Sequence, residues 1–371
     1  MRNAMHIVLL GGGHAHLEVL RRFGRRPQPG VRLSLITKGA HAPYSGMLPG
    51  FVAGHYSADE IHVPLAPLTQ RANCALVVAE ATRLDAERRS ILLSDGREIA
   101  GDVISINTGA VTDCSTGTSA ERCVAAKPID DFAQDWTRLM DVIEADPTLR
   151  IAVIGAGAAG VELALSIQHR LMQMPFAGGR IAESRVSLVG GDDILPSFPA
   201  KVRQRVARLL RGRGVTFLSG PDIEVIATRG LSGAGFQHVL VWATGVRPAD
   251  WLTRSGLALD HAGFVAVDRH LQSKSHEGIF CAGDAAGLVD GPQPKAGVIA
   301  VRQGPVLGEN LRRYASGRQL QSFAPPKIWL SLISTGNRYA VASRGKWSVE
   351  GRWTWYWKDW IDRRFVRKYK Q

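Results

Sequence analysis

The fold is decided by residues 150–160, which read RIAVIGAGAAG. An apolar run of strand length leads directly into a Gly-x-Gly-x-x-Gly loop, helical spacing continues to about His169, and a second apolar run follows at Val186–Val189. This order is typical of a dinucleotide-binding unit, because glycines let backbone N–H groups at a helix N-terminus approach a pyrophosphate. The predicted dinucleotide contacts here are Gly155, Gly157, Ala158 and Gly160.

The same order of elements occurs at the start of the chain. The apolar run His6–Leu10 leads into the loop GGGHAH at residues 11–16, then a helical stretch at Leu17–Arg22 and an apolar run at Val31–Ile36. This repetition predicts a second dinucleotide-binding unit. His16 stands where the third glycine is usual, so we expect the helix to pack less closely on its strand there. The predicted contacts in this loop are Gly11, Gly12, Gly13, His14 and His16.

Both units depart from the usual pattern at the ribose, where a carboxylate normally follows the second strand. The first unit has Thr37-Lys38 at this point, and the second has Gly190-Gly191 with Asp192 slightly later. Without a strand-end carboxylate, the second site need not exclude a 2′-phosphate. NADH and NADPH therefore both remain open as its ligand. We include Thr37, Lys38 and Gly190 among the predicted contacts.

The remaining pattern completes each unit. In the first, two short strands flanking Asp95-Gly96 indicate a hairpin, and a later strand ends at Thr108-Gly109. In the second, a basic helix over Lys201–Leu210 precedes strands near residues 215–218, 223–227 and 239–242, the last ending at Ala243-Thr244-Gly245. A strand then leads to Gly283-Asp284. A helix begins near Ala296, and we expect Gly304-Pro305 to kink it.

Taken in order, the two glycine loops, the two Thr-Gly ends and Gly283-Asp284 resemble the pyridine nucleotide–disulfide oxidoreductase superfamily over about residues 5–315. The resemblance implies an α/β fold with two Rossmann-like units, the second inserted in the first, each with a β-meander, plus a C-terminal helical tail. It implies FAD at the first loop, with Asp284 on the flavin ribityl chain, and NAD(P)H at the second. The expected segments are 1–115 and 247–320 for FAD, 116–246 for NAD(P)H, and 321–371 for the C-terminal region.

No Cys-x-x-Cys or Cys-x-x-x-x-Cys pair occurs among the four cysteines, so the chain resembles the branch that lacks a redox disulfide. Type II NADH:quinone dehydrogenases belong to that branch. Residues 43–50 and 294–297 look most like a narrower group of flavoproteins, which sometimes occur as a domain fused to selenophosphate synthetase.

The resemblance also implies roles for single residues. Glu162 would lie beside the nicotinamide, its alternative being a solvated helix carboxylate, and Lys127 would face the flavin. Lys295 and Ala296, with the helix N-terminus behind them, would stabilise negative charge on the reduced flavin. Tyr44 would belong either to a wall beneath the isoalloxazine or to a rigid loop. Gln303 matches one of two glutamines of the quinone dehydrogenases, but Val298 replaces the other, which weighs against a quinone.

Composition bounds the remaining possibilities. The formal net charge is +13, no His/Cys cluster has metal-ligand spacing, and no apolar stretch is long enough to span a bilayer. Unpaired cysteines fit a reducing cytoplasmic compartment. Within residues 347–370, an aromatic helical face with basic flanks is typical of a helix lying on a membrane. The alternatives are that this helix packs on the body of the protein or on the second subunit of a homodimer. No nucleic-acid recognition module is present. The positions on this face are Trp353, Tyr356, Trp357, Trp360 and Ile361.

Three functional hypotheses follow. The leading one is a peripheral NAD(P)H:quinone oxidoreductase that takes hydride from NAD(P)H onto FAD and passes two electrons to a quinone or another small acceptor. The second is a soluble reductase of sulfur or selenium species, which requires Cys114 or Cys123 near the flavin. The third is a flavin-binding redox sensor or interaction protein with slow turnover.

Overall fold

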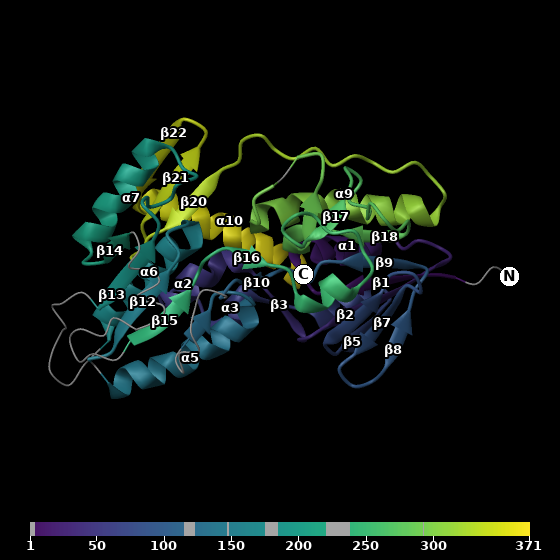
Figure 1. Cartoon of the computed structure of the whole chain (residues 1–371), viewed down its shortest axis with the longest axis horizontal. Helices are drawn as coiled ribbons and strands as arrows, with labels where there is room; N and C mark the ends of the chain where they lie inside the picture. The colour runs from purple at the N-terminus through teal and green to yellow at the C-terminus, as the bar shows by residue number, and fades with distance from the viewer. Residues whose placement is uncertain (1–3, 115–122, 147, 175–184, 220–237, 292) are drawn as a thin grey trace.

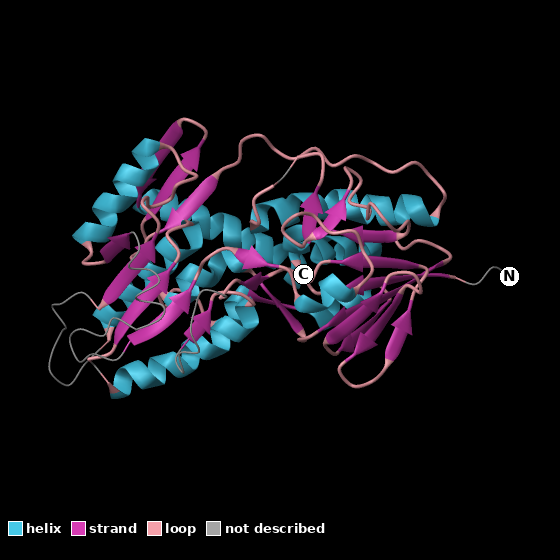
Figure 2. Ribbon diagram, in the orientation of Figure 1, coloured by secondary structure: helices cyan, strands magenta, loops and turns pink. Residues whose placement is uncertain are grey.

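The computed structural model describes residues 4–114, 123–146, 148–174, 185–219, 238–291 and 293–371. Two five-stranded parallel sheets form its two halves, with helices against each (Figure 1, Figure 2). The first sheet has the order β18-β9-β1-β2-β5. The first sheet contains β1 (Met5–Leu10), β2 (Val31–Thr37), β5 (Cys74–Val78), β9 (Val103–Ile106) and β18 (Ile279–Cys281).

The second sheet has the order β11-β15-β12-β13-β14, and its last four strands repeat the arrangement β9-β1-β2-β5 of the first sheet. The edge strands differ, because β11 precedes the other strands of its sheet in the chain and β18 follows those of its own. β1 and β12 occupy equivalent central places, and both lead into a glycine loop. Their apolar side chains are buried on both faces, as expected for parallel strands covered by helices. The second sheet contains β11 (Cys123–Ala125), β12 (Arg150–Ile154), β13 (Val186–Gly190), β14 (Thr216–Ser219) and β15 (His238–Trp242).

The predicted insertion of the second unit into the first is confirmed by the chain path. The chain leaves the first unit through β10 (Val111–Thr112) and returns through β16 (Val246–Arg247), and these two strands pair antiparallel. A meander of β6 (Ala81–Asp85), β7 (Ser90–Leu93) and β8 (Glu98–Ala100) follows β5, with the expected turn at Asp95-Gly96. The strand expected at 223–227, and with it the second meander, lies outside the described residues.

Helices cover each sheet. The first has α1 (His14–Arg25), α4 (Leu65–Arg71) and α9 (Gly297–Ala315), and the second has α5 (Ile129–Ala145), α6 (Ala158–Gln173) and α7 (Ala200–Gly212). α9 runs through Pro305 as one helix, and its Gly304 lies so close to α1 that a Cβ there would stand 2.8 Å from the Cβ of Glu18. Gly304 therefore permits close helix packing, and the helix does not end at the Gly-Pro step.

Shorter elements complete the first unit. β3 (His41–Pro43) pairs with β4 (His62–Pro64), and η1 (Ser45–Met47), α2 (Leu48–Val52) and α3 (Ala58–Ile61) lie between them. After β16 come η2 (Asp250–Arg254), β17 (Val265–Val267), η3 (Gly283–Ala285) and β19 (Ala286–Leu288), with β17 and β19 paired. η3 carries the predicted Gly283-Asp284 motif and follows the edge strand β18.

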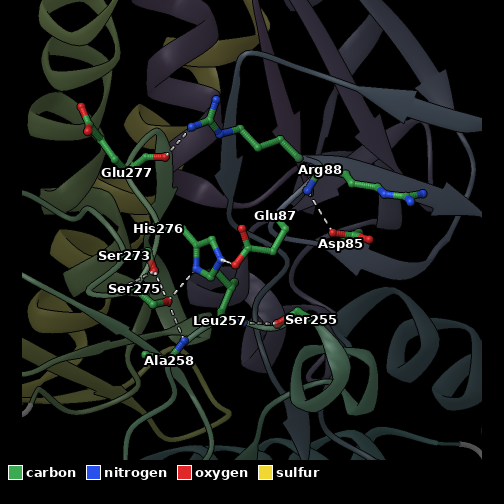
Figure 3. A network of polar contacts seen from close by, with 11 residues as sticks. Asp85, Glu87, Arg88, Ser255, Leu257, Ala258, Ser273, Ser275, His276 and Glu277 are labelled. Carbon is green, nitrogen blue, oxygen red and sulfur yellow. Dashed lines mark hydrogen bonds and ion pairs between the residues drawn. The ribbon is translucent and has the colours of Figure 1, made fainter.

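Polar contacts join the two sequence segments of the first unit. Figure 3 shows the turn after β6 facing the loop at residues 273–277. His276 Nε2 lies 3.2 Å from Glu87 Oε1, and Arg89 donates to the backbone carbonyl of Glu277 at 3.2 Å. The segments lie on either side of the inserted unit in the sequence, so these contacts help to assemble the sheet edge that carries η3.

The C-terminal region is only partly as expected. An α10 helix (Arg352–Lys370) is present, but it follows an antiparallel sheet of β20 (Ser331–Ser334), β21 (Ala340–Arg344) and β22 (Trp347–Gly351) that the sequence interpretation missed. The two-residue Gly345-Lys346 turn, with Gly345 at φ +57°, is the available hairpin signal. The sheet and α10 pack against both units, α10 reaching α1, α4 and η1.

Candidate functional site

A cavity of about 320 Å³ lies at the carboxyl ends of β1, β2 and β9 in the first unit. This edge of an open parallel sheet is where such folds bind ligands. Among the predicted residues that line it are Gly11, Gly12, Gly13, His14, Thr37, Lys38, Thr108, Gly109, Lys127, Gly283 and Asp284. Residues far apart in the sequence are thus brought to one cavity.

The first glycine loop has no space for side chains. Gly11 has φ +95°, and a Cβ there would lie 2.6 Å from the carbonyl oxygen of Asn107. A Cβ on Gly13 would lie 2.3 Å from Asn107 Oδ1. The loop therefore presents bare backbone to the cavity ahead of the α1 N-terminus, a cradle that fits a pyrophosphate.

Asn107, at the end of β9, holds this loop and was not predicted. Its Oδ1 accepts from the backbone N–H groups of Ala15 at 3.0 Å and His16 at 3.3 Å, and its Nδ2 donates to the carbonyl of Ala282 at 2.8 Å. One buried side chain therefore joins the glycine loop to the strand before Gly283. The Asn directly before Thr108-Gly109 was the available signal.

His16 is buried and does not line the cavity. Its Nδ1 lies 2.6 Å from the carbonyl oxygen of Gly11, and its Nε2 lies 2.9 Å from Ser105 Oγ. Burial lowers the pKa of His16 to about 4, so the ring is neutral. Because a carbonyl only accepts, Nδ1 carries the proton and Nε2 accepts from the serine. The imidazole thus replaces the close backbone packing of a third glycine with two hydrogen bonds.

Asp284 and Lys127 form an ion pair inside the cavity, with Nζ 2.5 Å from Oδ2. Both side chains are mostly buried. His14 lies in the same cavity, and burial lowers its pKa to about 4 despite the opposing effect of Asp284. The resemblance placed Lys127 and Asp284 at the flavin, and the structure brings them together from β11–α5 and η3.

The other predicted residues near the flavin lie behind the lining. Gln303 is buried, and its Oε1 accepts from the backbone N–H of Gly283 at 2.6 Å, so it orients η3. Lys295 points away: its Nζ donates to the carbonyl of Ala286 at 2.6 Å and lies 3.5 Å from the centre of the Phe264 ring. Ala296 caps α9, whose first residue, Gly297, does line the cavity. The helix N-terminus therefore faces the cavity without the lysine.

The second glycine loop is built more tightly between its own backbone segments. Gly155 has φ +118°, and a Cβ on Gly160 would lie 1.7 Å from the carbonyl oxygen of Gly155. A Cβ on Gly190, at the end of β13, would lie 2.3 Å from that of Ala156. No side chain fits at Gly190, which explains why this strand-end position carries no carboxylate. Thr244, before Gly245, donates from Oγ1 to the carbonyl of Asp113 at 2.7 Å.

Glu162 stands on α6 two residues after Gly160. Its Oε1 accepts from the backbone N–H of Ser334 in β20 at 2.7 Å. Burial raises the pKa of Glu162 to about 7, while Lys358 and the Ser334 bond act in the opposite direction. The carboxyl group therefore contacts the C-terminal sheet and is not a solvated helix carboxylate.

Tyr44 points from the 43–50 loop toward α10 and is not part of the lining. Its hydroxyl donates to Asp362 Oδ1 at 3.2 Å, and its ring stacks on Phe365 with centroids 4.2 Å apart. Lys358 pairs with Asp362 at 2.6 Å and also donates to the carbonyl of Gly46. The polar face of α10 is therefore buried beside the cavity wall. The sequence interpretation assigned no role to Lys358 or Asp362.

The opposite face of α10 is exposed. Trp353, Tyr356 and Trp360 are 54%, 51% and 54% exposed, while Trp355 on the other side is buried. Of the predicted aromatic face, Trp357 and Ile361 are half-buried. Along the part of the chain that the structure describes, no helix is long and apolar enough to cross a bilayer. The helix thus packs on the body and still presents aromatic rings to its surroundings.

Among the described residues, this cavity has neither a thiol in its lining nor a cluster that could bind a metal. Of the lining residues that the structure describes, none is a cysteine, and Cys114 lies elsewhere. The side chain of Cys123 lies outside the described residues. Within the same described ranges, no group of His, Cys, Asp and Glu has the arrangement of a metal site.

Comparison with known proteins agrees with this geometry. The model of the family described as pyridine nucleotide-disulphide oxidoreductase matches residues 5–304. The chain is 23% identical over 328 residues to the NADH dehydrogenase-like protein YutJ of Bacillus subtilis, covering 86% of each. It is 22% identical over 344 residues to the type II NADH:quinone oxidoreductase of Staphylococcus aureus, covering 85% of this chain and 84% of the relative.

Solved structures share the fold at low identity. The sulfide:quinone oxidoreductase of Aquifex aeolicus has a TM-score of 0.77 at 17% identity, covering 99% of this chain and 92% of that one. NDH2 from Plasmodium falciparum in complex with NADH has a TM-score of 0.77 at 14% identity, covering 99% and 97%. With two glycine loops on two equivalent parallel sheets and a family match across most of its length, the chain belongs to the pyridine nucleotide-disulphide oxidoreductase family, whose members bind FAD and NAD(P)H.

Proposed function

We propose that this protein is a peripheral membrane NAD(P)H dehydrogenase that uses FAD to pass two electrons to a quinone. The cavity at the first glycine loop carries the proposal, because Gly11, Gly13 and Asp284 meet there as the flavin site of this family requires. We assign residues 1–115 and 247–320 to the flavin unit and 116–246 to the NAD(P)H unit. The C-terminal region, 321–371, then covers both.

The residues of the chain would act as follows. FAD, when bound, would supply the redox chemistry that takes hydride from NAD(P)H and passes two electrons to a second substrate. The first glycine loop and the α1 N-terminus would hold its pyrophosphate, and Asp284 would hold its ribityl hydroxyls. The N-terminus of α9, at Gly297, would favour negative charge at the pyrimidine edge. Glu162 would lie beside the nicotinamide. Because its pKa is raised to about 7, its carboxyl group would be about half ionised at neutral pH.

A dithiol mechanism is less well supported by the cavity. Described lining residues include no cysteine, which favours direct transfer from flavin to a small acceptor over a sulfur or selenium reductase that needs a thiol. The reaction then balances as NAD(P)H, a proton and a quinone giving NAD(P)⁺ and a quinol. A slow redox sensor would bind the same cofactors and differ only in turnover.

The acceptor profile of flavin-loaded protein tests the proposal. Purified protein is loaded with FAD and assayed with NADH or NADPH against ubiquinone-1, menadione, polysulfide and oxygen. We expect quinone reduction to be fastest. Polysulfide as the best acceptor would support the reductase alternative, and flavin reduction without fast turnover on any acceptor would support the sensor.

The exposed face of α10 supports a place on the membrane surface. Trp353, Tyr356 and Trp360 are about half exposed and flanked by basic residues such as Arg364 and Arg367. We expect co-sedimentation with vesicles of anionic phosphatidylglycerol and weaker binding to phosphatidylcholine. The triple variant W353S/Y356S/W360S should lose binding while retaining FAD. A concentration-dependent dimer that disperses in the same variant would instead assign this face to a second subunit.

A further inference from the structure

The stretch from Lys127 to Asp131 lies where the chain runs from β11 into the first turn of α5. All five of its residues line the cavity at the first glycine loop. They belong to the inserted unit, whereas the rest of the lining is mostly from the first unit. This stretch is therefore a strap from one unit that forms part of the wall of the proposed cofactor site in the other.

Three charged side chains of the strap each bind a different element of the first unit. Lys127 pairs with Asp284 of η3 at 2.5 Å. Asp130 lies 2.9 Å from His62 Nε2 in β4, and Asp131 lies 3.2 Å from Lys38 Nζ, just after β2. Two of the three partners, Asp284 and Lys38, line the cavity themselves, so the strap is attached to its wall at more than one place.

The two aspartates have one local role that does not require these partners. They occupy the first turn of α5, where the helix dipole favours negative charge. That effect explains carboxylates at this place but not partners on two different elements of the other unit. His62 is further fixed by Nδ1, 2.6 Å from the carbonyl of Ala58, so its other nitrogen is directed at Asp130.

We propose that this strap retains the flavin nucleotide, with Asp130 and Asp131 holding it closed through His62 and Lys38. The proposal rests on FAD binding in this cavity, as argued above. Lys38 stands at the strand end where an acidic residue that binds the ribose is usual. Its ion pair with Asp131 gives a function to the lysine at this position. Exit of a dinucleotide from beneath the strap requires both outer ion pairs to open.

The rate of FAD release tests the strap without any turnover. FAD-loaded D130N/D131N protein is diluted, and the fluorescence of freed FAD is followed. Because partly exposed pairs each contribute under about 1 kcal/mol, we expect release about tenfold faster than in wild type. The matched control is D135N, which breaks an exposed ion pair on the same helix with Arg138, away from the cavity. It should release FAD at the wild-type rate.

Reversing one pair separates an electrostatic strap from simple damage to α5. K38D alone and D131K alone should each release FAD several-fold faster, and K38D/D131K should return most of the way to wild type. Failure of the double variant to recover, with thermal stability unchanged, would overturn the proposal. If wild-type protein does not bind FAD at all, the proposed function fails before the strap is tested.

The pH dependence of release gives a second readout. The hydrogen bond with Asp130 raises the pKa of His62, with burial opposing it and Ala58 and Asp59 assisting. The His41 ring also faces His62, with centroids 6.2 Å apart. The His62–Asp130 ion pair is fully formed below the ordinary pKa of histidine, and it is lost as the pH rises through the raised pKa of His62. Wild-type FAD release should therefore accelerate above neutral pH, and this dependence should be much smaller in D130N.

Discussion

The two glycine loops occupy equivalent places in two sheets that share four strands in the same order, yet they are held in different ways. In the second, Gly160 sits against the backbone of Gly155 and leaves no room for a Cβ. In the first, His16 fills that position and bonds to Gly11 and Ser105. The same backbone path is therefore secured by close packing in one unit and by a buried neutral imidazole in the other.

The carboxylates two residues further along differ as strongly. Glu18 on α1 binds Arg21, Arg22 and the tail residue Lys368, and these partners outweigh burial and lower its pKa to about 2. Its counterpart Glu162 on α6 has one backbone donor, and burial raises its pKa to about 7. The repeat therefore supplies a stabilising charge in the first unit and a titratable group in the second.

The largest expected effect is at Gly160. In G160A a methyl group would meet the Gly155 carbonyl, so the loop or α6 must move. We expect a loss of more than about 4 kcal/mol in unfolding free energy of the second unit and no measurable NAD(P)H binding. Urea unfolding and NADH titration measure this. The control G157A adds a methyl group into open space and should keep its stability, and FAD should remain bound in both.

Asn107 should be nearly as important to the first loop. N107A leaves the Ala15 and His16 N–H groups and the Ala282 carbonyl without this partner, and we expect about 3–4 kcal/mol of destabilisation together with weaker FAD binding. The control N310A removes another buried asparagine, bonded to His270 and Gln321. It should cost similar stability but leave FAD affinity unchanged. Equal FAD affinities in the two variants would show that Asn107 only supports folding.

Glu18 and Glu162 should respond oppositely to neutralisation. The lowered pKa of Glu18 stabilises the fold above its ordinary pKa of 4.5 and less as pH falls toward 2, so E18Q should lose about 2–3 kcal/mol at pH 8. The raised pKa of Glu162 costs stability as pH rises from 4.5 to about 7, so E162Q should gain about 2 kcal/mol at pH 8; the raised pKa already includes the opposing attraction of Lys358. Urea unfolding at pH 5 and pH 8 measures both, and effects of the same sign at pH 8 would refute the contrast.

The smallest effect is expected from replacing His16 by residues that keep only one of its two hydrogen bonds, to Gly11 or to Ser105. An Asn amide reaches the place of Nδ1 and can donate to Gly11, whereas a Gln amide reaches the place of Nε2 and meets Ser105. We expect H16N to retain FAD within about threefold of wild type and H16Q to weaken it by about tenfold, since the Gly11 bond supports the loop. Flavin fluorescence titration distinguishes the variants. An equal loss in both would mean that ring volume, not the Gly11 bond, is what the loop needs.

Sequence reasoning predicted the elements that depend on local pattern. Both glycine loops, the hairpin at Asp95-Gly96 and the α10 helix have signals contained within short stretches, and all are present. The three-stranded C-terminal sheet was not predicted, although Gly345-Lys346 is a local turn signal, because the tryptophan spacing that follows favours a helical tail. Which face of α10 packs on the protein could not be predicted, since either face of an isolated helix can pack.

For the two glycine loops, the sequence by itself determined which backbone segments turn there, because glycine at φ +95° or +118° is a local requirement. Only the tertiary structure decided what the side chains do. Lys295 turns toward Phe264 and Gln303 toward Gly283, while Asn107 enters the loop from β9. The physical reason is that hydrogen bonds and ion pairs depend on distances between segments far apart in the chain, and burial then sets each pKa. Equivalent positions such as Glu18 and Glu162 therefore read alike in sequence and differ in chemistry.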